Sequence, residues 1–397
     1  MRVALIAPEF IPAWGGAGTY AYNLAKGLSK YQDIEVHVIT PKRGLGYDKQ
    51  ALESLFDGKV KIHNISTASD SFFYNLRFQL ELFSQFEKLH KKFNFDIVHS
   101  TGLVHMPDVL LRLKKLSIPT LVTVHTTIDS QFDYKPNFAE FLLKGEPVEF
   151  LSMAAYPGIK LLQNRYVKGS DGFICVSDYV RRFIPTRKKL EVINNGIDTG
   201  RFCPGENSKF KFLDNIRTPK IIFCGRLLYM KGIKTLIEAA KLVLKEFDVH
   251  FIFAGQGNFK KWYSHLRGIE DKILFLGYVD YQDMHYLYQK CDIFVLPSFI
   301  ESFPMTLLEA MSCGLAPVAS DVGGIPEIIE DGKNGLLFSS HNSADLAKKL
   351  NKLLADKSLL RKIGINARDT VETKFTSSTM TLLTRDMYYN MSGEMNA

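Results

Sequence analysis

The chain has few cysteines, and none is arranged as a metal or redox motif. No two of the five form a C-x-x-C pair; they are Cys175, Cys203, Cys224, Cys291 and Cys313. An odd, scattered set argues against a disulfide framework and against a zinc site, and favours a reducing compartment. No apolar run is long enough to span a membrane. The first segment, RVALIAPEF, has no small-residue cleavage site, so we read it as a core strand and expect a cytoplasmic protein.

The chain carries a modest excess of positive charge, which is unevenly distributed between its two halves. The net charge is +8, with 26 Lys and Arg against 20 Asp and Glu in residues 1–205, and 24 against 22 in the remainder. A mildly basic first half is compatible with an anionic lipid surface, a phosphorylated substrate or nucleic acid. An ordinary solvated surface accounts for the charge equally well.

Short apolar segments alternate with amphipathic ones along the chain. Apart from a loop-like stretch at 199–219, predicted strands recur throughout; they cover 3–8, 35–40, 96–101, 120–126, 172–177, 190–196, 220–225, 250–255, 273–277, 293–298 and 316–320. This alternation predicts an α/β protein with two Rossmann-like, doubly wound domains, a linker near 200–218 and a central cleft. Helices are predicted at 72–95, with a Phe-rich face best explained by core packing and secondarily by membrane contact, and around VLLRLKKL (109–116).

Two cations lie in a turn of the second half, CGRLLYMKG. Arg226 and Lys231 stand between a strand that ends near Gly225 and a helix that begins near Gly232. A helix start favours anions, and two cations there could neutralise a diphosphate, arginine through forked hydrogen bonds and lysine as a point charge. From the residues alone, two exposed loop cations are an equally good interpretation.

Two carboxylates lie in the stretch LPSFIESFPMTLLEAMSCG. Glu301 is predicted on a loop and Glu309 early in the following helix, with Ser302 as its N-cap and Pro304 in its first turn. Two carboxylates could hold two hydroxylated groups, such as sugars. They could also serve a two-carboxylate hydrolase. The simplest alternatives are a helix-dipole charge for Glu309 and a surface position for Glu301.

The first half places glycines and a histidine just after predicted strands. The run Gly15-Gly16-Ala17-Gly18 opens the first helix, where a backbone without side chains can approach a phosphate or substrate closely. The run is not G-x-G-x-x-G, so an NAD site is poorly supported. His125 and Thr126 stand at the end of the segment predicted as a strand (120–126). A lone histidine is more often structural, but this one stands where ligands bind in such sheets.

Two further turns carry glycines. Gly323-Gly324 follow a predicted strand and precede a predicted helix with Pro326 near its start. VINNGID (192–198) stands at the expected domain junction.

Taken together, these segments resemble the family-4 retaining glycosyltransferases of the GT-B fold. The resemblance runs through the whole chain and rests on PEFIPAWGGAGTY, VTVHT, VINNGID, GRLLYMKG and PSFIESFPMTLLEAMSCGLAPVASDVGGIPEII, the last containing the E-x7-E region. It implies an acceptor-binding domain at 1–200 that includes a C-terminal helix at about 375–397, a donor-binding domain at 201–374, and hinges near 200 and 375 that close the domains over the donor.

The resemblance also implies roles for individual residues. His125, Arg226, Lys231 and Glu301 would be catalytic, with Arg226 and Lys231 clamping the donor diphosphate. Glu301 would contact the transferred sugar, and Glu309 the ribose. The remaining implied donor contacts are Gly16, Ser302, Phe303, Met305 and Thr306, with Gly323 and Gly324 shaping the pocket. Gly15, Gly16 and Thr126 would contact the acceptor. Pro304 has no N–H, so it cannot supply a backbone donor to the sugar.

The implied activity is transfer of a sugar from a UDP- or GDP-sugar to a hydroxyl of a glycan, lipid-linked or other acceptor, with retention. No D-x-D triplet occurs, so neither a metal nor another cofactor is expected. Nucleic acid is not an expected partner. Peripheral contact with the inner face of an anionic membrane is expected. The alternatives are a sugar-nucleotide epimerase of the GT-B type and a non-catalytic nucleotide-sugar-binding subunit. A phosphorylase is disfavoured, because no motif for a pyridoxal phosphate lysine is present.

Overall fold

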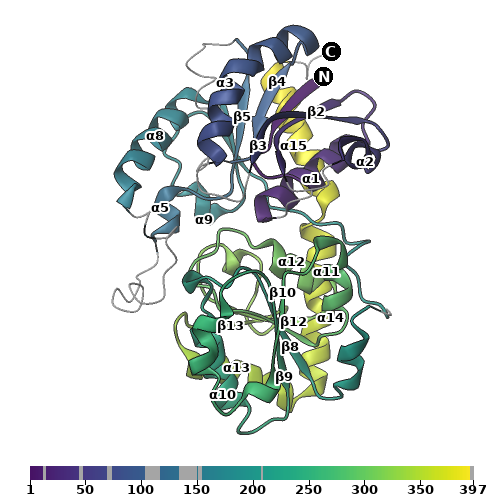
Figure 1. Cartoon of the computed structure of the whole chain (residues 1–397), viewed down its shortest axis with the longest axis vertical. Coiled ribbons are helices and arrows are strands. Elements are labelled where there is room, and N and C mark those ends of the chain that lie inside the picture. Colours follow the sequence, from purple (N-terminus) through teal and green to yellow (C-terminus); the bar gives the residue numbers. More distant parts are fainter. Residues whose placement is uncertain are drawn as a thin grey trace. The chain divides into compact units, whose positions relative to one another are not determined.

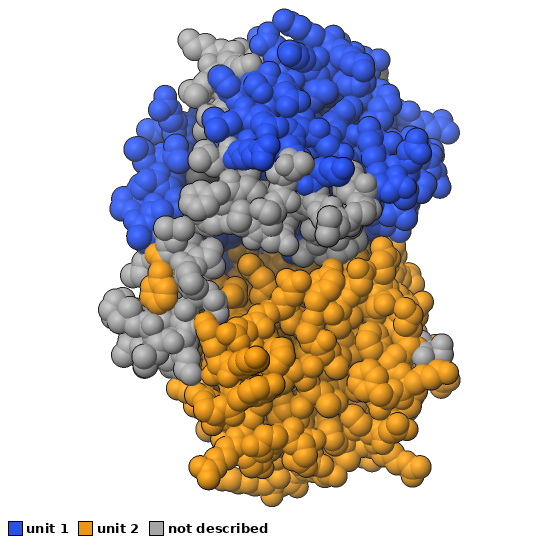
Figure 2. Space-filling model, in the orientation of Figure 1, with its two compact units in different colours: residues 1–132, 151–196, 377–397 blue, residues 133–150, 197–376 orange. Residues whose placement is uncertain are grey.

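The chain divides into two compact units, coloured separately in Figure 2. The structure, a computed structural model, describes residues 1–11, 15–43, 48–68, 74–102, 117–133, 150, 154–206 and 209–393. Unit 1 comprises Met1–Phe132, Leu151–Gly196 and Ser377–Ala397, and unit 2 comprises Asp133–Phe150 and Ile197–Thr376. The helix predicted at 109–116 lies outside the described residues.

Unit 1 is built on a parallel sheet of seven strands in the order β3-β2-β1-β4-β5-β6-β7. They are β1 (Arg2–Ile6), β2 (Glu35–Arg43), β3 (Val60–Ala68), β4 (Ile97–Ser100), β5 (Thr120–Val124), β6 (Gly172–Cys175) and β7 (Lys189–Val192). Alternate side chains of a strand point to opposite faces, so Val3 and Leu5 pack in one core and Ala4 and Ile6 in another. Helices therefore cover both faces of this sheet.

The helices of unit 1 are α1 (Gly16–Leu28), α2 (Lys49–Ser54), α3 (Tyr74–Phe93), α5 (Ile128–Gln131), α8 (Tyr156–Gly169), α9 (Asp178–Arg181) and α15 (Ser377–Ser392). The predicted Phe-rich helix is α3, and its residues Phe78, Leu82 and Phe86 are buried, which confirms core packing. The C-terminal helix α15 packs closely on α1. A Cβ on Gly27 would come within 2.0 Å of the Thr381 hydroxyl oxygen, so only glycine allows this approach.

Unit 2 holds a parallel sheet of six strands in the order β10-β9-β8-β11-β12-β13. They are β8 (Lys220–Cys224), β9 (His250–Ala254), β10 (Ile273–Gly277), β11 (Ile293–Leu296), β12 (Ala316–Ser320) and β13 (Leu336–Phe338). The α-helices are α10 (Ile233–Val243), α11 (Tyr281–Tyr288), α12 (Met305–Ser312), α13 (Ser343–Ala355) and α14 (Lys357–Lys374). In Figure 1, α10 and α13 lie on one side of the sheet, and α11 and α14 on the other.

Short 3-10 turns complete unit 2: η1 (Lys211–Asn215), η2 (Tyr229–Lys231), η3 (Phe259–His265), η4 (Glu270–Lys272) and η5 (Ile325–Glu327). The α-helix predicted after Gly323-Gly324 is wrong, because this segment forms the 3-10 turn η5 instead. The reason lies in Asn334, whose side chain accepts from the Glu330 N–H at 2.8 Å and donates to the Ile328 carbonyl at 3.0 Å. These bonds occupy backbone groups that a helix would need.

Both sheets follow the doubly wound order, so the predicted fold class is confirmed. The edge strands β3 and β13 were not predicted. In each sheet the strand order reverses at one place, between β1 and β4 in unit 1 and between β8 and β11 in unit 2. Ligands of such sheets bind beyond the carboxyl ends of the strands at this reversal. The loops that follow these strands are therefore where a site is expected.

Candidate active site

The loops that follow β8 and β11 bring a lysine and a glutamate together in unit 2. Lys231, at the end of η2, places its Nζ 2.5 Å from Oε1 of Glu301. The same Oε1 accepts a hydrogen bond from the Ser298 hydroxyl at 2.7 Å. The Lys231 side chain is 22% exposed and that of Glu301 11%. Two residues predicted as site residues thus form one ion pair at the reversal point.

Glycines allow the loops that carry this pair to approach one another. A Cβ on Gly232, at φ +67°, would lie 1.9 Å from the Pro297 carbonyl oxygen. A Cβ on Gly323, at φ +57°, would lie 1.9 Å from the Glu301 carbonyl oxygen, which also accepts from the Gly324 N–H at 2.9 Å. The backbone around Glu301 is therefore fixed from two sides, and larger residues at these glycines would displace it.

The other predicted residues of this region differ in how far their side chains are available. Arg226 is exposed and makes no ion pair with any residue that the structure describes. Ser302 and Thr306 are half-buried, whereas Phe303 and Met305 are buried, at 4% and 6% exposure. A ligand could therefore meet the side chain of Arg226, while Phe303 and Met305 could offer it mainly backbone groups.

The helix that carries Glu309 begins later than predicted. Its N-cap is Pro304, with φ −74° and ψ 119°, and α12 starts at Met305, so Ser302 is not the cap and Pro304 is not in the first turn. The physical reason is that a residue preceding proline avoids the helical region, which keeps Phe303 out of the helix. Glu309 consequently lies in the second turn of α12.

Glu309 is buried in unit 2, at 3% exposure. Its Oε2 accepts a hydrogen bond from the Tyr288 hydroxyl at 3.2 Å. Burial raises the pKa of the Glu309 carboxyl to about 7, because desolvation of the charge outweighs the hydrogen bond from Tyr288 and the field of Arg201. Glu309 is thus a carboxyl that titrates near neutrality, in a different setting from the ion-paired Glu301.

The predicted glycines of unit 1 lie where β1 leads into α1. The glycine run opens α1, as the sequence predicted: Gly15 is its N-cap and Gly16 its first residue. A Cβ on Gly15 would lie 2.4 Å from Oε2 of Glu9, whereas a Cβ on Gly16 would meet no described residue within 4 Å. The exposed backbone of Gly16 is thus open to a ligand, and Gly15 is packed against a carboxylate.

His125 and Thr126 directly follow β5 in unit 1. The His125 ring packs edge-to-face on the ring of Tyr20 from α1, with centroids 4.6 Å apart and an interplanar angle of 78°. The Thr126 hydroxyl lies 3.0 Å from the Ser130 hydroxyl, beside the capping box that Thr127 forms with Ser130 at the start of α5. Both residues stand at the carboxyl edge of the sheet, as predicted.

Three residues of these surroundings were not predicted from sequence: Ser298, Tyr288 and Tyr20. Ser298 ends a buried apolar run, where a serine carries no signal of its own. Tyr288 and Tyr20 contact Glu309 and His125, which lie 21 or more residues away along the chain. These contacts form only when the strands and helices pack together in the folded structure.

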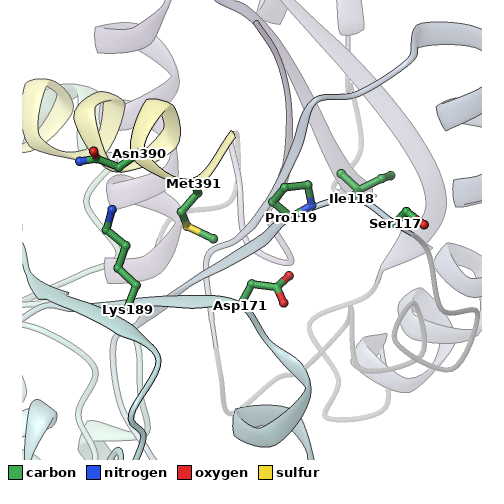
Figure 3. Close-up of a pocket in the computed structure, with 7 residues that line it drawn as sticks. All are labelled: Ser117, Ile118, Pro119, Asp171, Lys189, Asn390 and Met391. Carbon is green, nitrogen blue, oxygen red and sulfur yellow. The ribbon is translucent and has the colours of Figure 1, made fainter. Parts of the chain in front are cut away.

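A pocket of about 520 Å³ opens in unit 1 at the opposite edge of the sheet. Figure 3 shows its lining residues, Ser117, Ile118, Pro119, Asp171, Lys189, Asn390 and Met391. Residues 117–119, Asp171 and Lys189 stand at the amino ends of β5, β6 and β7, away from the edge at which ligands of such sheets bind, and Asn390 and Met391 come from α15. The Asp171 carboxylate already accepts from the N–H and hydroxyl of Thr120, at 2.9 and 3.0 Å. We therefore assign no substrate to this pocket.

Among the residues that the structure describes, no helix is long and apolar enough to cross a membrane. Nor do these residues include a group of three or more His, Cys, Asp or Glu placed to hold a metal ion.

Comparison with known proteins identifies the family. Residues 14–201 match the family described as Glycosyltransferase Family 4, and residues 205–370 match Glycosyl transferases group 1. The chain is 25% identical to N-acetyl-alpha-D-glucosaminyl L-malate synthase of Bacillus anthracis, over 96% of this chain and 95% of that protein. It is 26% identical to alpha-maltose-1-phosphate synthase of Mycolicibacterium smegmatis, over 99% of this chain and 100% of that protein.

Solved structures share the fold. Sucrose-phosphate synthase from Thermosynechococcus elongatus superposes with a TM-score of 0.82 at 18% identity, over 99% of this chain and 100% of that one. Anabaena HepE in complex with UDP superposes with a TM-score of 0.74 at 20% identity, over 98% of this chain and 100% of that one. The two sequence matches and the shared fold lead to one conclusion: the chain belongs to the family-4 glycosyltransferases of the GT-B fold, and it is a glycosyltransferase.

Proposed function

We propose that this protein transfers a sugar, with retention, from a nucleoside-diphosphate sugar to a hydroxyl of an acceptor. The observation that carries the proposal is the Lys231–Glu301 pair at the reversal point of the unit 2 sheet, with Nζ and Oε1 2.5 Å apart. A cation suits a phosphate and a carboxylate suits sugar hydroxyls. A donor that offers both groups in sequence would use both members of the pair.

In this proposal Arg226 and Lys231 act on the leaving group. Cleavage of the bond between the anomeric carbon and the diphosphate oxygen leaves negative charge on the nucleoside diphosphate. Two cations placed beforehand stabilise that charge as it develops, and they act most strongly when the donor excludes water. The exposed guanidinium of Arg226 can offer forked hydrogen bonds, while Lys231 contributes a point charge.

Retention follows if the acceptor attacks from the face that the diphosphate leaves. The acceptor hydroxyl then forms the new bond to the anomeric carbon, and its proton passes to an oxygen of the departing phosphate. The setting of the glutamates supports this route over a glutamate nucleophile. Glu301 is held by Lys231 and Ser298, and Glu309 is buried beside Tyr288.

The remaining residues have positioning roles in the proposal. Glu309 accepts from the ribose hydroxyls, and Glu301 from hydroxyls of the transferred sugar. Backbone N–H groups at the start of α12, at Met305 and Thr306, face the sugar or phosphate. In unit 1, His125 contacts the donor sugar, and the open backbone of Gly16 contacts phosphate and acceptor.

The donor is proposed to be a UDP- or GDP-sugar. HepE, a structural neighbour, has been solved in complex with UDP-glucose. The test is a panel of UDP-, GDP- and ADP-sugars, in which release of nucleoside diphosphate is measured and the anomeric configuration of the product is determined by NMR. Lys231→Ala should lose the activity. The control is Lys234→Ala, which removes a cation three residues further on that pairs with Glu238 of the same helix, and this variant should retain the activity. Inversion, or full activity of Lys231→Ala, would contradict the proposal.

The acceptor is proposed to be a glycan or lipid-linked molecule presented at an anionic membrane surface. One relative, from Campylobacter jejuni, is named for transfer to a diphospho-undecaprenol-linked acceptor. In unit 1, helix α8 exposes Leu161 and Leu162, at 70% and 47%, together with the exposed cations Arg165 and Lys168. Apolar side chains beside cations suit the boundary of an anionic bilayer.

Flotation with vesicles tests this surface. The wild-type chain should float with vesicles that contain anionic lipid and much less with neutral ones. A variant carrying Leu161→Ser, Leu162→Ser and Arg165→Gln should stay at the bottom, while Leu80→Ser, which alters an exposed leucine on α3, should float as the wild type does. Equal flotation with both lipids, or of both variants, would rule the surface out.

A further inference from the structure

A chain of buried hydrogen bonds in unit 1 joins the C-terminal helix α15 to β5, the strand that His125 directly follows. The Tyr388 hydroxyl of α15 lies 2.6 Å from Nδ1 of His99 on β4, and Nε2 of His99 lies 2.7 Å from the Thr123 hydroxyl on β5. The same Thr123 hydroxyl lies 2.8 Å from the Tyr20 hydroxyl of α1. All four residues are at most 1% exposed.

The chain of hydrogen bonds ends on the Tyr20 hydroxyl, and the ring of Tyr20 then contacts His125. The two rings pack edge-to-face at a centroid distance of 4.6 Å. Burial raises the pKa of the Tyr20 hydroxyl to about 12, and the side chains of Thr123 and of Thr384, which lies one helical turn before Tyr388 on α15, act in the opposite direction. The Tyr20 ring is thus held through its hydroxyl by β5, and it contacts the His125 ring edge-to-face. Aromatic pairs of this kind have a preferred geometry, so one ring orients the other.

Burial keeps the central histidine of this network neutral. It lowers the pKa of His99 to about 3, and the nearby His125 acts in the same direction. A neutral imidazole donates through one nitrogen and accepts through the other. His99 therefore donates to one of its two partners, Tyr388 and Thr123, and accepts from the other. Removing either partner would leave a buried nitrogen unsatisfied, which is costly.

We propose that Tyr388, His99, Thr123 and Tyr20 are positioning residues for His125, so that α15 sets the orientation of the His125 ring. This rests on the proposed function, in which His125 contacts the donor sugar. The network does not touch the reacting atoms. It holds a ring that does, and a small misplacement of such a ring is enough to slow the reaction while donor binding in unit 2 is left unchanged.

The test uses Tyr388→Phe in the full-length protein, with Tyr389→Phe as the matched control. Tyr389 is the next residue of α15, and its hydroxyl bonds Asp33 at the surface. Turnover and donor KM are measured for both, together with the imidazole NMR resonances of His125 and their pH titration, assigned by comparison with His125→Gln. We expect Tyr388→Phe to lower kcat about tenfold at unchanged donor KM and to shift the His125 resonances. Tyr389→Phe should match the wild type in all of these.

Two further variants keep the outcome decisive. Thr123→Val removes the central hydroxyl with little change of shape and serves if Tyr388→Phe does not fold. Tyr20→Phe retains the ring against His125, so it should lose less activity than Tyr20→Leu. Unchanged His125 resonances in folded Tyr388→Phe and Thr123→Val would overturn the proposal. Full turnover in His125→Gln would instead contradict the proposed role of His125, while the resonances would still report whether α15 orients the ring.

Discussion

The two units share a strand order but differ in the chemistry of the loops at its reversal. In unit 2 these loops carry the exposed Arg226 and the Lys231–Glu301 pair, with the titrating Glu309 on the helix that follows. In unit 1 they carry an open glycine backbone at Gly16, and His125 follows the neighbouring strand β5. The same fold therefore provides two different surfaces, one with side-chain charges suited to an anion with hydroxyls and one whose open backbone allows close approach of a ligand.

In the proposed function there is a division between the units. The side chains of unit 2 bind and stabilise the charged part of the donor, so their substitution should alter donor affinity and departure of the diphosphate. The residues of unit 1 orient the reacting groups, so their substitution should alter turnover with less effect on donor affinity.

The largest effect is expected from Arg226→Ala in unit 2. Removing a preorganised cation from a developing phosphate charge lowers kcat about 10²- to 10³-fold. Arg226→Lys should recover part of this loss, because it restores the charge without the forked donors. Steady-state kinetics with the accepted donor measure both. Wild-type turnover in Arg226→Ala would contradict the division between the units.

A smaller effect is expected from His125→Ala in unit 1. We expect kcat to fall about 10- to 100-fold, since positioning and not charge neutralisation is lost. Affinity for the nucleoside diphosphate, measured by titration calorimetry, should remain within twofold of the wild type. A large loss of nucleotide affinity would instead place His125 among the charge-handling groups.

Glycines of the two units should respond differently to alanine. Gly232→Ala in unit 2 should lower the free energy of unfolding by about 2–4 kcal/mol, because a Cβ would collide with the Pro297 carbonyl at 1.9 Å and φ is +67°. Gly16→Ala in unit 1 should change it by less than about 0.5 kcal/mol, because no described residue lies within 4 Å of the added Cβ. Chemical denaturation measures both. Equal destabilisation would show that open space at Gly16 is not available.

The smallest effect concerns pH and Glu309. Its pKa is raised from 4.5 to about 7, so the folded protein binds the extra proton over that interval. The free energy of unfolding should therefore fall as pH rises from about 4.5 to 7, on the order of 1–3 kcal/mol from this group. In Glu309→Gln that contribution should be absent. Donor affinity should rise through the same interval in the wild type, because the carboxylate is a stronger acceptor for ribose than the acid.

Denaturation curves and donor titrations of wild type and Glu309→Gln, taken between pH 4.5 and 8, check both effects. Parallel pH profiles of the two proteins would show that Glu309 does not titrate in this range. A lower donor affinity at high pH would show that its charge does not hold the ribose.

Much of the fold was readable from sequence because buried parallel strands are continuous apolar runs. The strand around VALIAP and the one around IFVLPS are of this kind, and both lie at the centre of their sheets. The edge strand β3, VKIHNISTA, mixes polar and apolar residues, and β13 is only three residues long, so neither stood out. The start of α12 was misplaced because Ser302 has the chemistry of an N-cap, while Pro304 decides where the helix begins.

The candidate site was predictable as far as it depends on local order in the chain. Lys231, Glu301 and His125 each follow a strand, and that position is visible in the sequence. The residues that hold them in place were not predictable. Ser298, which bonds Glu301, stands at the end of an apolar run where a serine gives no signal, and Tyr388 is far along the chain from its partner His99. Such contacts are set by the register of strands and the seating of helices, which a single sequence does not display.

The central claim is that Lys231 holds the diphosphate and Glu301 the sugar. Binding of the nucleoside diphosphate and of the matching nucleoside-diphosphate sugar to Lys231→Ala and Glu301→Gln, measured by titration calorimetry, tests it directly. The claim predicts that Lys231→Ala weakens both ligands, about tenfold or more, since a charged contact is lost. It predicts that Glu301→Gln weakens only the sugar-bearing ligand and leaves the nucleoside diphosphate equal or tighter, because Lys231 is released from its pair. Unchanged binding of both ligands to Lys231→Ala, or an equal loss of both in Glu301→Gln, would contradict it.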